Sequence, residues 1–328
     1  MTATTTIPTR TASPMASRVG WTALTAIVPM VWGTTYIVTT RLLPEGHPLF
    51  AGLMRSLPAG LIAVAISRTL PRASWWWKSL ALGTLNMGAF FPLLFLAAQH
   101  LPGGVAATLG AAQPIVVAFL AVAILHEKLS AWRVCWGIVG MIGVAMVVLG
   151  PGAGFDVIGT IAGLAGAASM GTGVVLTKKW GKPPGCSAIG FAGWQLTAAG
   201  LVLLVPALVI DGVPPGIDGP AILGYSWLGL VGALVTYTIW FSGIRHLPVT
   251  ATALLGLLSP LVAAILGALL AGEALGAVQV AGFVLALTAM VAGQLAPRSL
   301  RASPGPPATA AAPPPESLPA QVPTRSTT

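Results

Sequence analysis

Few residues of this chain could do chemistry inside its long apolar runs, and Arg55 is the most conspicuous of them. It is the one charged residue placed well within such a run. A charge at the centre of a hydrocarbon layer costs about 3 kcal/mol or more on insertion scales, so Arg55 should face a cavity or a partner. Its guanidinium could bind an anionic or carbonyl group of a ligand. It could also reach the membrane surface or pair with carbonyls at a helix end.

Aromatic and amide side chains within the apolar runs form a second set of candidates. Flat rings and a few hydrogen-bond donors are what a pocket for planar or amphipathic organic molecules requires. The rings could instead pack or anchor the chain at the membrane surface, and the amides of Asn86 and Gln195 could join neighbouring helices. The substrate-binding candidates besides Arg55 are Trp32, Tyr36, Asn86, Gln113, Trp194, Gln195, Tyr237 and Trp240.

Two prolines, Pro114 and Pro260, lie in the middle of apolar runs. A proline inside a helix removes one backbone hydrogen bond and leaves a carbonyl free near the midplane. Matching kinks at these positions could shape a cavity or act as hinges, or they could be helix curvature without ligand contact. Gln113 precedes the first proline and Ser259 precedes the second, so either side chain could reach a ligand.

Glu127 and Glu273 are carboxylates at the ends of two apolar runs, and no Asp or Glu lies in the middle of any run. A proton relay would need a carboxylate inside a cavity, so we interpret this pair as gate or helix-end residues. The chain has no HExxH, no paired intramembrane aspartates and no GxxxxGK[ST], and its two cysteines lack metal-ligand spacing. We therefore expect no enzyme activity, no metal site and no cofactor.

The composition shows what kind of elements must position these residues. The chain is 55% hydrophobic and 7% charged, with a mean hydropathy of +0.88. A soluble domain carries about 25% charged residues, so this surface suits a lipid bilayer and not water. The net charge of +9 does not indicate nucleic acid, because the 16 Lys and Arg are scattered between apolar runs.

Ten apolar runs have about the length that a membrane-spanning helix needs, which is roughly 20 residues. They are continuous and lack alternation of period two, which favours helices over barrel strands. Residues 1–18 and 297–328 are rich in Thr, Ser, Ala and Pro and are predicted to be disordered tails. The predicted spans are 19–40, 49–66, 80–98, 105–125, 134–149, 157–177, 188–210, 221–243, 249–271 and 278–295.

The charges between the runs predict the orientation of the chain. If the runs cross alternately, fourteen of the 16 Lys and Arg fall on one side, Arg41 falls on the other, and Arg55 lies inside a run. By the positive-inside rule the Lys- and Arg-rich side is the cytoplasm. We therefore expect a multi-pass protein of the plasma membrane with both termini in the cytoplasm.

One stretch of the chain occurs twice. Residues 99–129 align without a gap on 245–275, shifted by 146 positions, with twelve identities that include His, Pro, Gly and a lone Glu. Such matches rarely share one register by chance, so the chain consists of two halves. Five spans per half is an odd number, so the halves cross the membrane in opposite senses. The predicted fold is an all-α polytopic membrane protein of ten transmembrane helices, arranged as two five-helix inverted repeats at 19–149 and 157–295.

Several motifs resemble the EamA family of the drug/metabolite transporter superfamily. VWGTTYIV at 31–38 is similar to the family's first-helix motif, and GWQLTAAGLVLL at 193–204 and TYTIWFSGIRHLPVTATALLGLLSPLVAAILGALLAGEAL at 236–275 are similar to its seventh-to-ninth helices. Residues 32–61 most resemble the type associated with export of the blue pigment indigoidine. The resemblance extends over about 21–295 and implies transport of amino acids, metabolites, pigments or drugs. Met170 departs from the family, whose members often have an aromatic residue there.

We expect a secondary transporter that exports small organic metabolites, pigment-, amino-acid- or drug-like, by alternating access. An importer or exchanger with the same fold and a non-transporting membrane sensor or scaffold are the alternatives. The expected partners are a small-molecule substrate and the lipid bilayer, without nucleic acid. The sequence leaves open whether the protein forms a homodimer.

Overall fold

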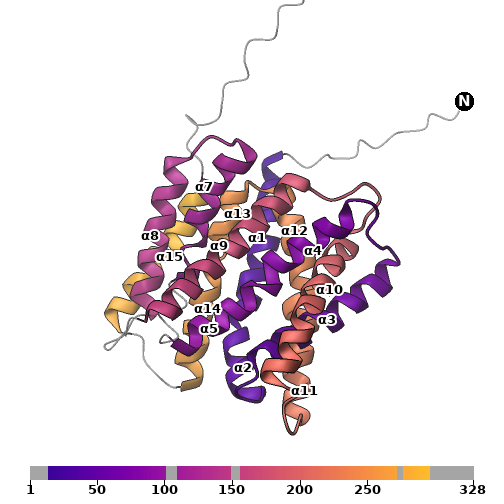
Figure 1. Cartoon of the computed structure of the whole chain (residues 1–328). Helices are drawn as coiled ribbons and strands as arrows, with labels where there is room; N and C mark the ends of the chain where they lie inside the picture. Colours follow the sequence, from indigo (N-terminus) through magenta and orange to yellow (C-terminus); the bar gives the residue numbers. More distant parts are fainter. Residues whose placement is uncertain (1–13, 101–108, 149–155, 272–275, 296–328) are drawn as a thin grey trace, which may run out of the picture. The chain divides into compact units, whose positions relative to one another are not determined.

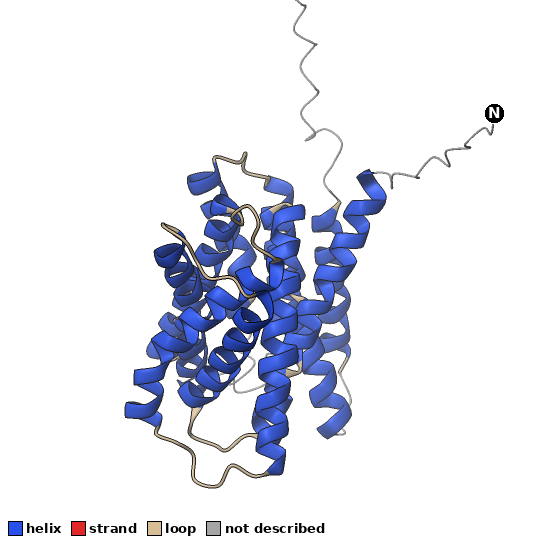
Figure 2. Cartoon of the chain, turned by 90° about the vertical axis from the view of Figure 1, so that its right-hand side faces the viewer, coloured by secondary structure: helices blue, strands red, loops and turns tan. Residues whose placement is uncertain are grey.

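The computed structural model describes residues 14–100, 109–148, 156–271 and 276–295. All regular elements among these residues are helices (Figure 2). The described residues as far as Leu295 belong to one compact unit. Both predicted tails lie outside the described residues except for 14–18, which already belong to the first helix. That helix begins at Pro14 because a proline suits the first turn, where its missing N–H would have no helical partner.

The described helices pack against one another in one unit (Figure 1). The first half of the chain contains α1 (Pro14–Gly33), α2 (Thr35–Leu42), α3 (Pro48–Ser67), α4 (Trp75–Gly83), the π-helix η1 (Thr84–Gly88), α5 (Phe90–His100), α7 (Gln113–Leu125) and α8 (Ala131–Val148). The second half contains α9 (Val157–Trp180), α10 (Ala188–Pro206), the π-helix η2 (Ala207–Asp211), α11 (Gly219–Ser226), the π-helix η3 (Trp227–Val235), α12 (Thr236–His246), α13 (Val249–Leu255), α14 (Leu258–Ala271) and α15 (Ala277–Gln294).

Seven of the described helical stretches are long and apolar enough to cross a membrane. Two further helices, Gln113–Leu125 and Ala131–Val147, are apolar but shorter, and the span predicted at 80–98 is divided among α4, η1 and α5. The prediction of a helical, multi-pass membrane protein is confirmed at this level. The seven stretches are Arg18–Thr39, Pro48–Ser67, Val157–Trp180, Ala188–Asp211, Gly219–His246, Val249–Leu266 and Ala277–Gln294.

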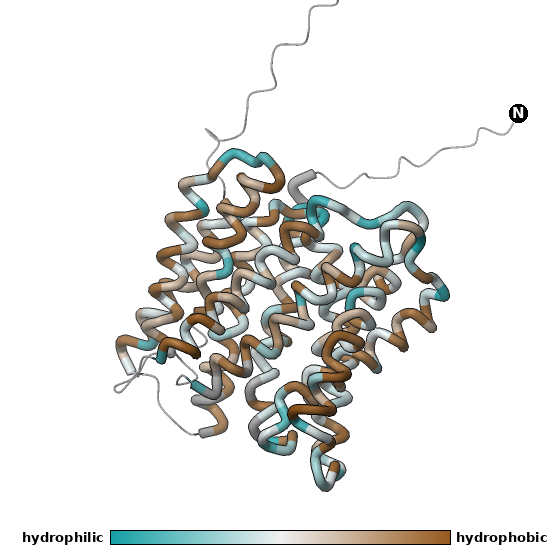
Figure 3. Tube along the Cα trace, viewed as in Figure 1, coloured by the Kyte–Doolittle hydropathy of each residue, from teal (hydrophilic) through white to brown (hydrophobic). Residues whose placement is uncertain are grey.

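The outside of the helical body is apolar. Figure 3 shows hydrophobic residues along the helices and hydrophilic residues gathered in the connecting loops. Large aliphatic side chains on the outside are 61–77% exposed, which water would oppose and lipid tails accept. Examples are Ile66, Ile161, Val205, Val209 and Leu269.

Glycines bring two pairs of helices into close contact, and each pair joins the two halves of the chain. A Cβ on Gly200 of α10 would lie 2.5 Å from the Leu57 Cβ of α3. A Cβ on Gly143 of α8 would lie 2.6 Å from the backbone nitrogen of Ala286 in α15. Lipid tails are as apolar as the helix surfaces, so close backbone packing is a main source of attraction between membrane helices. The close contacts α3–α10 and α8–α15, called joints below, therefore hold the two halves of the unit together.

Helix ends are also fastened by charged side chains from distant elements. The Asp211 carboxylate accepts hydrogen bonds from the backbone N–H groups of Leu49 (2.6 Å) and Phe50 (3.1 Å), at the start of α3. The Lys178 ammonium donates to the carbonyls of Ile244, Arg245 and Leu247 at 2.8–3.1 Å, around the end of α12. A carboxylate at a helix start and a cation at a helix end both meet unpaired backbone groups and complement the helix dipole.

Several helices are interrupted near the middle of their predicted spans. The breaks fall at Thr34 between α1 and α2, at Ala89 between η1 and α5, at Ala111 and Ala112 before α7, and at Gly256 and Leu257 between α13 and α14. At the breaks the backbone keeps right-handed helical dihedrals but forms tight turns. The Thr34 N–H donates to the Val31 carbonyl and the Gly256 N–H to the Ala253 carbonyl, both at 3.0 Å.

The breaks correct the expectation that the two prolines lie in the middle of continuous helices, while their role as kinks or hinges stays a prediction. Pro114 lies in the first turn of α7 and Pro260 in the first turn of α14, so neither is in the interior of a continuous helix. The physical reason is that first-turn N–H groups have no partner within the helix, so a proline there removes no helical hydrogen bond.

The contact between α3 and α10 predicts opposite effects for two glycine substitutions. Gly200→Ala should reduce the free energy of unfolding by about 1–3 kcal/mol, because the added Cβ overpacks the contact with Leu57. Gly20→Ala should leave stability unchanged or raise it by up to ~1 kcal/mol, since no heavy atom lies within 4 Å of its Cβ and alanine favours the helix. Thermal unfolding of both variants in detergent measures the difference; equal midpoints would contradict the assignment of this joint.

Candidate functional site

A cavity of about 280 Å³ lies where the helices are interrupted. Its lining comes from both halves of the chain and includes residues at all four breaks or directly beside them. The lining residues are Trp32, Thr35, Thr39, Arg55, Phe90, Phe91, Leu94, Gly110, Ala111, Gln113, Pro114, Ala167, Met170, Tyr237, Trp240, Ala253, Gly256, Leu257, Ser259 and Pro260.

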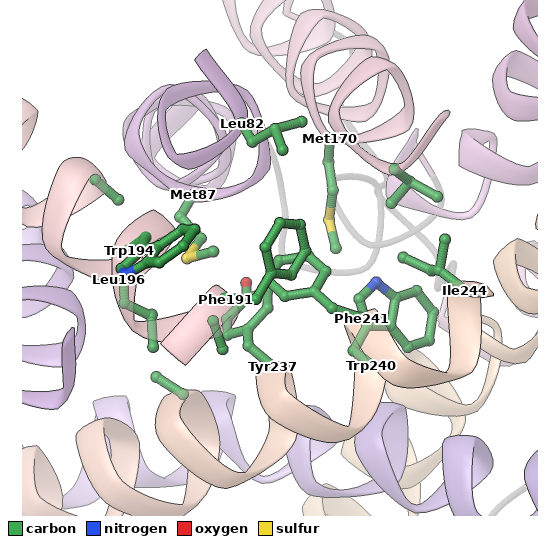
Figure 4. Close-up of a cluster of buried hydrophobic side chains, with 14 of the residues drawn as sticks. Leu82, Met87, Met170, Phe191, Trp194, Leu196, Tyr237, Trp240, Phe241 and Ile244 are labelled. Atoms are coloured by element: carbon green, nitrogen blue, oxygen red, sulfur yellow. The ribbon is translucent and has the colours of Figure 1, made fainter. Parts of the chain in front are cut away.

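Aromatic rings make one wall of this cavity. The Trp32 ring lies 5.1 Å from the Tyr237 ring and 5.1 Å from the Trp240 ring, centroid to centroid, in tilted arrangements. Tyr237 and Trp240 are each 1% exposed, so the rest of the protein holds them firmly. Figure 4 shows Tyr237, Trp240 and Phe241 arising from one helix, α12, with Met170 reaching toward them from another. The wall offers flat, rigid faces to a ligand.

Arg55 lines the cavity and is 8% exposed. Its Nη2 donates to the Gly232 carbonyl at 2.8 Å, its Nη1 lies 3.5 Å from the Thr35 hydroxyl, and its guanidinium lies 4.9 Å from the centre of the Phe91 ring. The sequence left open a ligand contact and a pairing with helix carbonyls. The structure shows a backbone carbonyl as a partner and also places the guanidinium at the cavity, so Arg55 brings a positive charge to the site.

The Gly232 carbonyl belongs to the π-helix η3. It also accepts a hydrogen bond from the Trp32 indole Nε1 at 3.1 Å. The same indole nitrogen lies 3.2 Å from the Thr236 hydroxyl. One irregular turn of the second half therefore positions Arg55 and Trp32 from the first half. π-helical turns often occur at functional sites.

Two hydrogen-bond donors at the cavity have no partner. The Trp240 Nε1 and the Gln113 Nε2 are both buried without a hydrogen bond, and both residues line the cavity. A buried donor without a partner costs about 1–3 kcal/mol, so such donors are rare in a finished core. A ligand that reaches them from the cavity would supply the missing acceptors.

Asn86 and Gln195 lie elsewhere, in a polar contact between helices. The Asn86 Nδ2 donates to the Gln195 Oε1 at 3.0 Å and lies 3.4 Å from the Thr177 hydroxyl; all three residues are fully buried. These residues come from η1, α10 and α9. Neither amide belongs to the cavity lining, and their geometry matches the interhelical alternative that the sequence left open.

The other candidates divide in a similar way. Trp194 is buried, donates its indole N–H to the Thr69 carbonyl at 2.8 Å and does not line the cavity. Pro114 and Pro260 do line it. The side chain of Tyr36 and the whole of Glu273 lie outside the described residues. Glu127 follows the end of α7, away from the cavity lining, which agrees with a helix-end position.

Sequence reasoning passed over Phe90, Phe91, Thr35 and Thr39, and it noted Met170 only as a departure from a family pattern. Phe90 and Phe91 carry the stacking faces by which Trp32 was selected, so the same criterion could have found them. The threonines carry no comparable signal, because threonine is common in membrane helices and often bonds to its own helix backbone.

Comparison with known proteins gives two matches to one family. Residues 20–149 and 157–292 each match the EamA-like transporter family. Protein PecM of Dickeya dadantii is 40% identical over 263 residues, covering 80% of this chain and 88% of that protein. A "Probable amino-acid metabolite efflux pump" of Salmonella typhimurium is 26% identical over 288 residues, covering 84% and 94%. One solved structure covers 84% of this chain and 96% of its own, with a TM-score of 0.69 at 19% identity, which supports the fold alone.

The contact between Asn86 and Gln195 predicts energetic coupling between the two residues. Asn86→Ala and Gln195→Ala should each lower stability, because each leaves the other amide buried without its partner. The double variant should lose less than the sum of the two, by about 0.6–1.7 kcal/mol, the range found for polar contacts between membrane helices. A double-mutant cycle of unfolding free energies measures this; strict additivity would contradict the contact.

Proposed function

The chain belongs to the EamA-like transporter family, and on that premise we propose that it is a secondary transporter which exports small organic metabolites from the cytoplasm by alternating access. The observation that carries the proposal is the cavity at the helix breaks, with its aromatic wall and its hydrogen-bond donors. Transporter substrate sites are typically built near the bilayer midplane from interrupted helices.

An architecture of ten transmembrane helices in two inverted repeats is part of this proposal. It is supported by the two separate family matches and by the joints α3–α10 and α8–α15. In the proposed numbering, each joint pairs corresponding spans of the two halves, the second with the seventh and the fifth with the tenth. Two similar halves around one site supply inward-open and outward-open states of similar energy.

The proposed orientation has the Lys- and Arg-rich loops in the cytoplasm. Lys178 and the end of α12 with Arg245, two sites on the predicted cytoplasmic side, are in direct contact. Asp211 and the start of α3, both predicted on the other side, are also in contact. These contacts agree with the sorting of charges by the positive-inside rule. Each contact also holds helix ends together at one face of the unit. In alternating access, a transporter opens and closes at these faces.

Export is proposed over import because one relative is named an efflux pump. Comparing the metabolites of spent medium from a deletion strain and an overexpressing strain tests the direction and identifies the cargo. Metabolites that accumulate outside only when the protein is present support export. Depletion of the medium indicates import, and no change in any metabolite, together with no flux in proteoliposomes, indicates a sensor or scaffold.

The place of Arg55 in the cavity predicts a loss of transport on substitution. Arg55→Met should lower the flux of the identified metabolite at least tenfold, because the positive charge and the contact with Gly232 are both removed. Arg55→Lys should keep part of the flux, since it retains the charge but not the planar fork of donors. Uptake into proteoliposomes of known orientation provides the measurement.

Arg41→Met is the matched control, because Arg41 is exposed at the end of α2 and does not line the cavity. Its flux should equal that of the unaltered protein. Gel filtration of each variant separates loss of transport from loss of folding. Unchanged flux in a well-folded Arg55→Met variant would remove this residue from the site.

A further inference from the structure

We propose that the cavity binds small aromatic carboxylates, that is, organic anions with a flat body and an acidic head group. This inference names the substrate class of the proposed transport site and therefore rests on the proposed function. It is carried by three properties of the cavity: its charge, its unpartnered donors and the shape of its walls.

The charge of the cavity favours an anion. Among the described residues that line it, Arg55 is the sole charged one, and none is Asp or Glu. Removed from bulk water, the field of one guanidinium is screened far less than at an exposed surface. An ammonium group in the cavity would meet a like charge and no carboxylate, so cations are disfavoured.

The unpartnered donors require an acceptor. Trp240 is 1% exposed, and its Nε1 has no hydrogen-bond partner although the residue lines the cavity. The Gln113 Nε2, at the start of α7, is likewise buried without a hydrogen-bond partner. An indole nitrogen can only donate, and a carboxylate can only accept. Charge-assisted bonds to a carboxylate are also stronger than bonds between neutral groups.

Two helices of ordinary length begin at the cavity. The helix α7 has 13 residues and contributes Gln113 and Pro114 from its first turn, and α14 has 14 residues and contributes Ser259 and Pro260. The start of a helix carries a partial positive charge from its aligned peptide dipoles. The first-turn N–H groups of Ile115 and Ser259 already donate to the carbonyls of Ala112 and Gly256, so these helix starts offer no free donor there. The positive character of the cavity therefore comes mainly from Arg55 and the Trp240 donor.

The walls select a flat body of limited size. Trp32, Tyr237, Phe90 and Phe91 offer aromatic faces, and Met170 offers a flexible apolar surface. The volume of about 280 Å³ is at the small end of ligand pockets, which hold roughly 300–1,000 Å³. One or two fused rings with a single carboxylate fit this description.

The test compares three probes that share one ring system and differ in their head group. The purified full chain in lipid nanodiscs is titrated by calorimetry with 2-naphthoate, with 2-naphthamide and with 2-naphthylmethylamine. We expect 2-naphthoate to bind at least tenfold more tightly than the neutral amide, and the cationic amine to give no measurable binding. Equal affinities for the three probes, tighter binding of the amine, or no binding of 2-naphthoate would overturn the inference.

A pair of tryptophan variants tests the donor. Trp240→Phe keeps an aromatic ring but loses the N–H, and it should weaken 2-naphthoate binding at least fivefold. Trp132→Phe is the control, because the Trp132 indole donates to the Ala292 carbonyl at 2.8 Å and the residue does not line the cavity. It should bind 2-naphthoate like the unaltered protein. If Trp240→Phe does not fold, the comparison of the three probes on the unaltered chain still decides the inference.

Transport measurements separate this inference from the proposed function. Export of neutral or cationic metabolites without carboxylates would overturn the substrate class and leave the transporter function intact. Absence of flux for every metabolite would overturn the transporter function, whatever the naphthoate titration shows. Competition of 2-naphthoate with the flux of an exported metabolite, lost in Trp240→Phe, would support both.

Discussion

The carbonyl of Gly232 is the point on which the cavity depends. It accepts hydrogen bonds from Arg55 of α3 at 2.8 Å and from Trp32 of α1 at 3.1 Å, and so connects the first half of the chain to η3 of the second. Gly232 lies in a π-helix, an irregular element that often occurs at functional sites. A buried cation and a large aromatic ring thereby reach defined positions at membrane depth.

The same constraint explains why the cavity lies at the helix breaks. Backbone groups that leave the helical pattern need partners, and hydrocarbon offers none. The breaks near Thr34, Ala89, Ala112 and Gly256 therefore face the interior of the protein, where side chains and the cavity surround them. Residues beside these breaks make up much of the cavity lining. The irregular backbone at the breaks therefore affects the packing of the helices and also supplies residues to the proposed binding site.

Two sets of buried polar groups bear on the cavity. The Asn86–Gln195 contact and the indole N–H groups of Trp32 and Trp194 are engaged within the protein and hold helices together. The donors of Trp240 and Gln113 are not engaged, and both residues line the cavity. Unpartnered buried groups also occur away from the cavity, at Ser79, Thr197 and Tyr225. The position of the Trp240 and Gln113 donors at the cavity, beside Arg55, is therefore what supports the proposed ligand site.

The sequence by itself determined the solvent of this protein and the residue types of its site. The apolar runs, the scarcity of charge and the cost of Arg55 in lipid are local properties, so they predicted a helical membrane protein and made Arg55, Trp32, Tyr237 and Trp240 candidates for a pocket. Only the tertiary structure decided which of three similar amides, Asn86, Gln113 and Gln195, meets the cavity. It also decided that Asp211 caps the start of a helix 162 residues away. The physical reason is that a hydrogen-bond partner comes from whichever segment packs alongside, and no property of the residue itself reveals that segment.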